Sequence, residues 1–122
     1  TMADPMPDPP PIALSSGMFG TFDPVHSGTG TATIYELAPD VRVLRLEDFR
    51  VNNGPDLYVW LTSNVPTNIT APVGDFVDLG PLRGNVGNQN YDIPADVDLD
   101  VYNAVVIYCL PFRINFTVAE LR

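Results

Sequence analysis

Residues 101–116 read VYNAVVIYCLPFRINF, and this stretch decides the fold. Within it, residues 104–110 are uninterruptedly apolar or aromatic and rich in Val and Ile, which favours a β-strand covered on both faces. Side chains alternate along a strand, so two faces are predicted. They are Val105, Ile107 and Cys109 on one side, and Val106, Tyr108 and Leu110 on the other. Pro111 has no N–H to give to a neighbouring strand, so the strand is predicted to end there.

Bulk composition limits the classes of protein to consider. A chain of 122 residues with 45% hydrophobic residues is the size of one domain with its own core. Six basic against 15 acidic residues give a net charge of -9, which repels nucleic acid and anionic lipid surfaces. No apolar run is long enough to cross a membrane, so no membrane span is predicted.

The beginning of the chain differs from the rest. Residues 1–11 read TMADPMPDPPP, a composition that favours an extended segment outside any core. We therefore predict a Pro-rich flexible tether over residues 1–14 and a single β domain over residues 15–122. The tether is interpreted either as a disordered chain end or as a spacer that holds the domain away from a membrane anchor or a neighbouring domain.

The remainder of the chain alternates short extended runs with turns. Residues 29–37, 41–51 and 57–62 carry strand patterns, with a bulge near Val43 or a break near Asp48 expected in the second. Apolar residues never recur at helical spacing for three turns. The pattern predicts an all-β fold, an antiparallel β-sandwich or flattened barrel of about seven to nine short strands with nearly no helix.

Two later segments are assigned by their polar residues. Residues 84–92, GNVGNQNYD, are rich in turn-forming residues and are interpreted as a loop. Residues 96–100, DVDLD, alternate acidic and apolar side chains and are interpreted as a strand with one wet face. They resemble the start of a calcium loop, but Val101 replaces the required Gly and no Glu closes the loop.

Three stretches of this chain resemble the DM-thirteen domain family. They are residues 48–61 (DFRVNNGPDLYVWL), 79–94 (LGPLRGNVGNQNYDIP) and 102–109 (YNAVVIYC), the last followed by Phe112. The opening of the domain is also similar, at Gly17, Phe19, His26 and Gly28. One departure is Thr117, where the family pattern leads us to expect Gly, and it concerns the geometry of the final strand.

The resemblance implies an all-β extracytoplasmic module, secreted or anchored at the cell surface through the N-terminal tether. Such modules are found beside cytochrome-like DOMON domains and in matrix proteins of the Skeletor type. The cysteine of the family implies a redox or electron-transfer accessory role, and Cys109 lies at that position. The implied partners are a redox protein or cytochrome-like domain, or a cell-surface or matrix component.

Cys109 lacks the companions that known redox centres need. A blue-copper site requires two His with the Cys, and His26 is the only one in the chain. Haem attachment, iron–sulfur clusters and structural zinc all require further Cys or His ligands. The sequence predicts no intrinsic cofactor and no metal site, so a redox cofactor would belong to a partner. No nucleophile has a visible base and orienting group, which favours a protein without catalytic activity of its own.

A second interpretation treats Cys109 as a small buried hydrophobic residue, which is how free Cys most often occurs. The domain would then be a non-catalytic interaction module of the cell surface or matrix. Tyr58 and Trp60 are two residues apart and so lie on the same face of a strand; with His26, they are the candidate binding residues. The polar loop over residues 63–75 offers a further contact surface.

Overall fold

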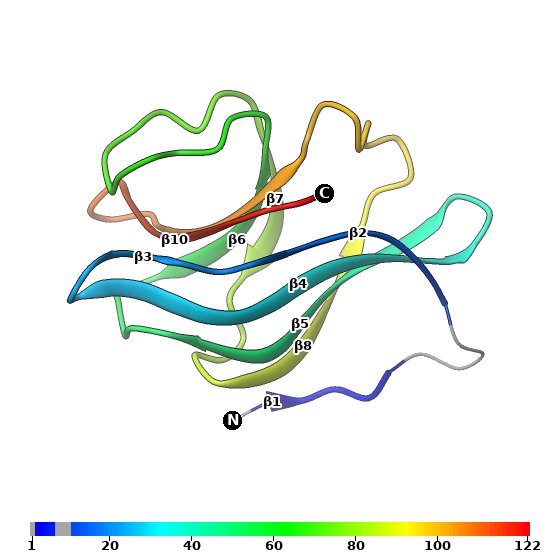
Figure 1. The fold of residues 1–122 in the computed structure, drawn as a ribbon, viewed down its shortest axis with the longest axis horizontal. Helices are drawn as coiled ribbons and strands as arrows, with labels where there is room; N and C mark the ends of the chain where they lie inside the picture. The colour runs from blue at the N-terminus through cyan, green and yellow to red at the C-terminus, as the bar shows by residue number, and fades with distance from the viewer. Residues whose placement is uncertain (1, 7–10) are drawn as a thin grey trace.

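The computed structural model describes residues 2–6 and 11–122, and the chain forms two facing β-sheets (Figure 1). The strands are β1 (Met2–Ala3), β2 (Ile12–Met18), β3 (Thr21–Asp23), β4 (His26–Ala38), β5 (Val41–Val51), β6 (Leu57–Thr62), β7 (Phe76–Pro81), β8 (Gly87–Ile93), β9 (Ala104–Cys109) and β10 (Ile114–Glu120). One sheet has the order β1-β8-β5-β4-β2, with β3 beside β4. The other has the order β10-β9-β6-β7.

The predicted all-β class is confirmed, and the described residues contain no helix. All pairs are antiparallel except β1 with β8. The sheets form an open sandwich rather than a closed barrel, although β2 and β10 meet on one side. There Phe19 bridges Ala119, and Ser16 and Arg122 exchange two backbone hydrogen bonds of 3.2 and 3.0 Å.

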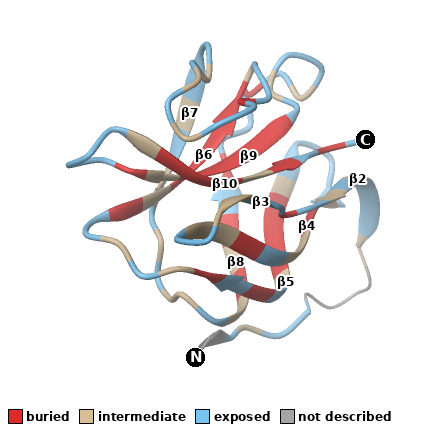
Figure 2. Cartoon of the chain, turned by 60° about the vertical axis from the view of Figure 1, so that its left-hand side comes forward, coloured by how far each residue is buried: buried red, intermediate tan, exposed pale blue. Residues whose placement is uncertain are grey.

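Strand β9 is central in the smaller sheet, between β6 and β10, as its sequence predicts. It ends at Cys109, before Pro111, and a turn over residues 110–113 leads into β10. Figure 2 shows the buried residues concentrated on the strands that line the interface between the sheets. The predicted inner face of β9 is confirmed, because its residues belong to the hydrophobic core: Val105, Ile107 and Cys109.

Strand β8 was not predicted, because its inner face is partly polar. Gln89 is 0% exposed, and its Nε2 donates to the carbonyl of Gly84 at 2.7 Å. The Tyr91 hydroxyl donates to Gln89 Oε1 at 2.6 Å. These internal hydrogen bonds offset the cost of burying the amide, so a sequence that looks like a loop forms a core strand.

The strand predicted over residues 96–100 is wrong. The amides of Val97 and Val101 donate to the carbonyls of Pro94 and Asp98 at 3.2 and 3.1 Å, so this segment turns. The Asp98 carboxylate also accepts from the amide of Asp100 at 2.9 Å. Such local side-chain bonds compete with sheet pairing, and alternation alone does not reveal them.

Strand β5 does not break near Asp48; it continues through this position with a bulge. The register with β4 shifts where Asp48, with φ of 52°, lies opposite Gly30, with φ of 99°. A Cβ on Gly30 would lie 2.6 Å from the Glu47 carbonyl oxygen, so this position requires Gly. At Val43 and Leu44 the register with β4 is regular, so the bulge expected there is not observed; a second shift lies next to them, between Glu36 and Ala38 of β4.

The N-terminal residues 2–6 are attached to the larger sheet. Strand β1 pairs with β8, and Arg45 Nη1 donates to the carbonyls of Asp4 and Pro5 at 2.9 and 3.1 Å. The expected separation from the domain therefore does not hold for these residues. Thr1 and residues 7–10 lie outside the described residues. Strand β2 begins at Ile12, and the role of residues 1–14 as a tether stays a prediction.

Thr117, the departure from the family pattern, lies at an irregularity of β10. The register with β9 shifts between Asn115 and Thr117. Thr117 is buried, and its Oγ1 donates to the carbonyl of Gly20 at 2.7 Å. A Cβ on Gly28 would lie 2.6 Å from the same hydroxyl oxygen. The Thr side chain thus occupies the space that Gly28 leaves open, and the strand continues past the bulge.

Candidate functional site

Cys109 is the last residue of β9 and points into the core, with 0% of its surface exposed. Its thiol donates to the carbonyl oxygen of Pro55, with the sulfur 3.2 Å from the oxygen. Pro55 belongs to the turn 52–56 that precedes β6, and both Pro55 and Asp56 are exposed. A single layer of chain therefore separates the sulfur from solvent at this end of the sheet.

The turn 52–56 is held from two sides. Asn52 Oδ1 accepts from the amide of Ser27 at 2.8 Å, and Asn85 Nδ2 donates to the Asn52 carbonyl at 3.2 Å. Gly54 lies so close to Phe116 that an added Cβ would approach its ring to 2.5 Å. Segments from β4, β10 and the β7–β8 connection thus fix the turn above the sulfur.

The one hydrogen bond of the thiol does not prepare it for reaction in the closed structure. Its one described hydrogen-bond partner is a carbonyl, which accepts from a thiol and offers no proton to a thiolate. No cationic side chain or His of the described residues hydrogen-bonds to the sulfur. The thiolate is the nucleophile in disulfide exchange, so reaction requires the turn 52–56 to open.

His26 is at the start of β4, and its partner is Asp23 rather than Cys109. His26 Nδ1 lies 2.8 and 2.9 Å from the two carboxylate oxygens of Asp23. The hydrogen bond from His26 holds the pKa of Asp23 below its usual value, helped by the amides of Val25 and His26. The His26 ring also meets Phe116 edge-on, with the centroids 4.9 Å apart. This arrangement fixes the tight turn into β4.

Trp60 is on the outer face of the smaller sheet, opposite the face that carries Cys109. Its ring is stacked between Phe76 and Tyr108, with centroid distances of 3.9 and 4.0 Å. Tyr58 is on the same strand but outside this stack, and the negative charge of Asp56 raises its pKa. The structure therefore distributes the predicted site residues over separate places rather than one site.

The loop 63–75 folds back over this outer face, beside β10 in Figure 1, and Asn115 holds it there. Asn115 is 1% exposed, and its Nδ2 donates to the carbonyls of Asn68 and Ala71 at 3.1 and 2.9 Å. Its backbone amide donates to the carbonyl of Ile69 at 2.8 Å. The sequence indicated a surface loop but gave no signal for this long-range anchor.

A cavity of about 270 Å³ lies between the loop and the stacked rings. Its walls include Trp60, Phe76, Tyr108, Arg113 and Asn115, together with loop residues 69–74. Of these, Trp60 alone was a predicted binding residue. Alternation along the strand predicted that Tyr108 lies on this face. The position of Arg113 was not predictable in this way, because it depends on the turn after β9, where Arg113 adopts a φ of 55°.

The described part of the chain contains no group of three or more His, Cys, Asp or Glu side chains arranged to hold a metal ion. Across the same residues, no helix has the length and apolar character needed to cross a membrane.

Comparison with known proteins gives one match. No curated protein and no solved structure matches this chain. A family model described as "Electron transfer DM13" matches residues 19–121, a range that includes the turn 52–56, Cys109 and the cavity over Trp60. The chain therefore belongs to the electron transfer DM13 family.

Proposed function

We propose that the domain is an extracytoplasmic accessory module of electron transfer in which Cys109 is the reacting residue. Membership of an electron-transfer family supports the general role. The observation that carries the specific role is the position of the sulfur, buried but directly beneath the exposed turn 52–56 and bonded to Pro55. Opening of this one turn exposes the thiol without separating the two sheets.

The chemistry that suits a lone thiol is exchange with a disulfide of a partner protein. The Cys109 thiolate attacks one sulfur of that disulfide, a new bond forms between Cys109 and the partner, and the other partner sulfur leaves as a thiolate. A thiolate of a second, electron-donating protein then attacks the partner's sulfur in the mixed disulfide, a disulfide forms between these two proteins, and Cys109 leaves as a thiolate. A redox cofactor, such as the haem of a cytochrome-like domain, would belong to the partner.

The surface charge and the chain's N-terminal segment bear on the partner and the location. A net charge of -9 favours docking against a basic surface on the redox partner. The N-terminal residues would connect the module to a cell-surface anchor or a neighbouring domain, or leave it secreted. The module itself has no catalytic role in this proposal.

The test measures how fast an aromatic disulfide reagent reacts with native Cys109 as denaturant increases. If local opening exposes the thiol, the rate at low denaturant exceeds the rate allowed by global unfolding and depends only weakly on denaturant. Pro55→Gly, which loosens the turn, should then raise the rate by about tenfold or more. Pro39→Gly, in another exposed turn, is the matched control and should leave the rate unchanged.

The competing candidate is a non-catalytic interaction domain of the cell surface or matrix, in which Cys109 only fills the core. Its complete burial among the hydrophobic core residues is the observation that favours this role. The same measurement separates the two candidates. A labelling rate that follows global unfolding at every denaturant concentration would reject the redox role and leave the interaction role.

A further inference from the structure

The cavity beneath the loop 63–75 has features of a small-molecule site, independent of Cys109 on the other face of the sheet. Its volume of about 270 Å³ suits a ligand of about ten non-hydrogen atoms. Its floor is the outer face of β6 and β9, where Trp60 and Tyr108 are stacked, and Phe76 extends the stack from β7. Because both faces of the Trp60 ring are covered by these neighbours, only its edge can line the cavity, and an aromatic edge favours contact with the face of a planar aromatic ligand.

One cation lies at this cavity. Arg113 lines it and is exposed, and its guanidinium has no hydrogen bond or ion pair among the described residues. The positive φ of Arg113 and the bond from its amide to the Leu110 carbonyl, 3.3 Å long, fix the backbone from which this side chain extends. The chain has a net charge of -9, so this guanidinium is a positive group on a mostly negative protein, and it can bind a carboxylate through two parallel hydrogen bonds.

Two residues that line the cavity each carry a buried polar atom without a hydrogen-bond partner within the described residues. The atoms are Trp60 Nε1, a donor, and Asn115 Oδ1, an acceptor. The two carbonyls of Asn68 and Ala71 fix which way the Asn115 amide points, because only its Nδ2 can donate to them. Its Oδ1 is therefore the atom without a hydrogen-bond partner within the described residues. Buried polar groups without partners are rare in folded proteins, and a ligand that supplies an acceptor and a donor would complete both.

We propose that this cavity binds a small aromatic acid that carries a hydroxyl group, a phenolic acid. The ring lies among Trp60, Tyr108 and Phe76, and the carboxylate pairs with Arg113. The hydroxyl donates to Asn115 Oδ1, while Trp60 Nε1 donates to an oxygen of the ligand. Each part of the ligand thus contacts one feature of the cavity. The ring contacts the aromatic side chains, the carboxylate contacts the cation, and the ligand oxygens contact the two polar atoms that lack partners.

The experiment uses the one Trp of the chain as the reporter, because Trp60 gives a single indole N–H signal in a nuclear magnetic resonance spectrum. Titration with para-hydroxybenzoate should shift this signal in a saturable way, with Kd on the order of 1 mM or tighter for a ligand of this size. The neutral para-hydroxybenzyl alcohol should bind at least tenfold more weakly, because it lacks the charge that pairs with Arg113.

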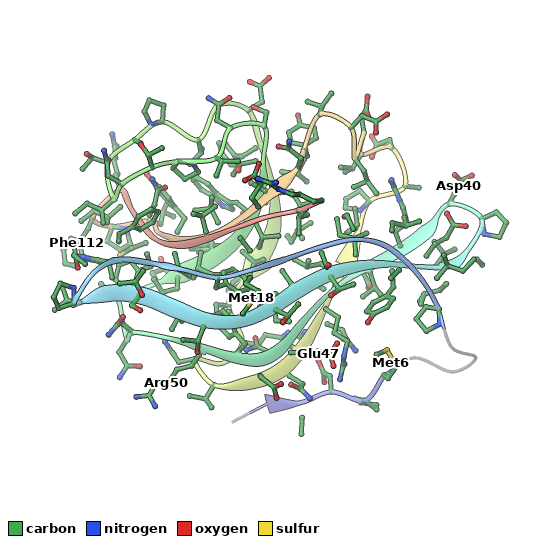
Figure 3. The ribbon with its side chains drawn as sticks, viewed as in Figure 1. Met6, Met18, Asp40, Glu47, Arg50 and Phe112 are labelled. Carbon is green, nitrogen blue, oxygen red and sulfur yellow. The ribbon has the colours of Figure 1, made fainter. Side chains whose placement is uncertain are left out.

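Two variants test the role of the charge. Arg113 is exposed, so the Arg113→Gln variant should fold normally. This variant should lose the preference for the acid over the alcohol. Arg50→Gln is the matched control, because Arg50 is also exposed but belongs to the opposite sheet and lies at the lower edge of Figure 3, away from this loop. It should keep the full preference.

Three results would overturn the proposal: no saturable shift of the indole signal, equal binding of acid and alcohol, or stronger binding of a non-aromatic sugar acid such as glucuronate. The last would show that charge alone, without the aromatic walls, accounts for binding. None of these results affects the labelling of Cys109, so failure here is distinguishable from failure of the redox role.

Discussion

The thiol of Cys109 donates to the carbonyl of Pro55, and this 3.2 Å contact joins the end of β9 to the turn before β6. The two residues are far apart in the sequence, so the contact closes a long loop of chain. Because the sulfur is fully buried, this single side chain contributes both packing and a hydrogen bond to the same place. Removing this side chain should therefore lower the free energy of unfolding, whether or not the thiol reacts.

We expect Cys109→Ala to lower the free energy of unfolding by about 1–2 kcal/mol, through the lost hydrogen bond and a small cavity. Urea unfolding followed by the fluorescence of Trp60 measures this change. An unfolding free energy within about 0.3 kcal/mol of the parent would show that the contact with Pro55 contributes nothing measurable.

Ile107→Ala should be more costly, by about 3–4 kcal/mol. Ile107 is 0% exposed on the central strand β9, with β6 and β10 on either side, so the space it leaves is poorly refilled. Ile12→Ala is the matched control, because Ile12 is 66% exposed on the edge strand β2 and should cost less than about 0.5 kcal/mol. Equal losses for the two variants would contradict the central position of β9.

Asn115→Ala should release the loop 63–75 from β10. The change leaves the carbonyls of Asn68 and Ala71 without their donor, and we expect a loss of about 2–3 kcal/mol. Faster amide exchange over residues 68–74 should accompany it, measured by hydrogen–deuterium exchange.

Asn64→Ala, in the same loop, is the control for this change, because Asn64 is exposed and its side-chain amide makes no hydrogen bond within the described residues. Its exchange rates should match those of the parent. If Asn115→Ala also left exchange over the loop unchanged, the backbone bond from Asn115 to Ile69 would be sufficient to hold it.

The sequence predicted the parts of the fold that depend on local pattern. Apolar alternation was enough to identify β9 and the burial of Cys109, because core strands need covered side chains on fixed faces. It failed for β8, whose buried Gln89 is satisfied by the Gly84 carbonyl and the Tyr91 hydroxyl, and for the turn at Asp98. In both places side-chain hydrogen bonds, rather than hydrophobicity, decide the structure.

The site was less predictable than the fold for a related reason. Trp60 was identified as a binding residue, but its companions come from β7, β9, the turn before β10 and β10 itself. The loop 63–75 creates the cavity only because Asn115 anchors it across the sheet. Nothing local to Asn115 or Arg113 in the sequence indicates contacts with a loop about forty residues away.

The pair of Asp23 and His26 predicts a specific dependence of stability on pH. The hydrogen bond from His26 lowers the pKa of Asp23 in the folded state, while the unfolded chain has the ordinary value of about 3.9. The folded state therefore holds the proton less tightly than the unfolded state. The resulting stability is fully present above the unfolded pKa and is lost as the pH falls through the folded pKa.

Asp23→Asn removes the titrating group but keeps an oxygen that accepts hydrogen bonds. The parent should therefore be more stable than this variant near pH 6, and the two should converge as the pH falls from about 4 to about 2, measured by urea unfolding at each pH. Asp96→Asn is the control, since Asp96 is exposed and its carboxylate forms no hydrogen bond within the described residues. A constant difference between the parent and Asp23→Asn across this range would mean that ionised Asp23 does not stabilise the turn into β4, and that His26 is held there by Phe116 alone.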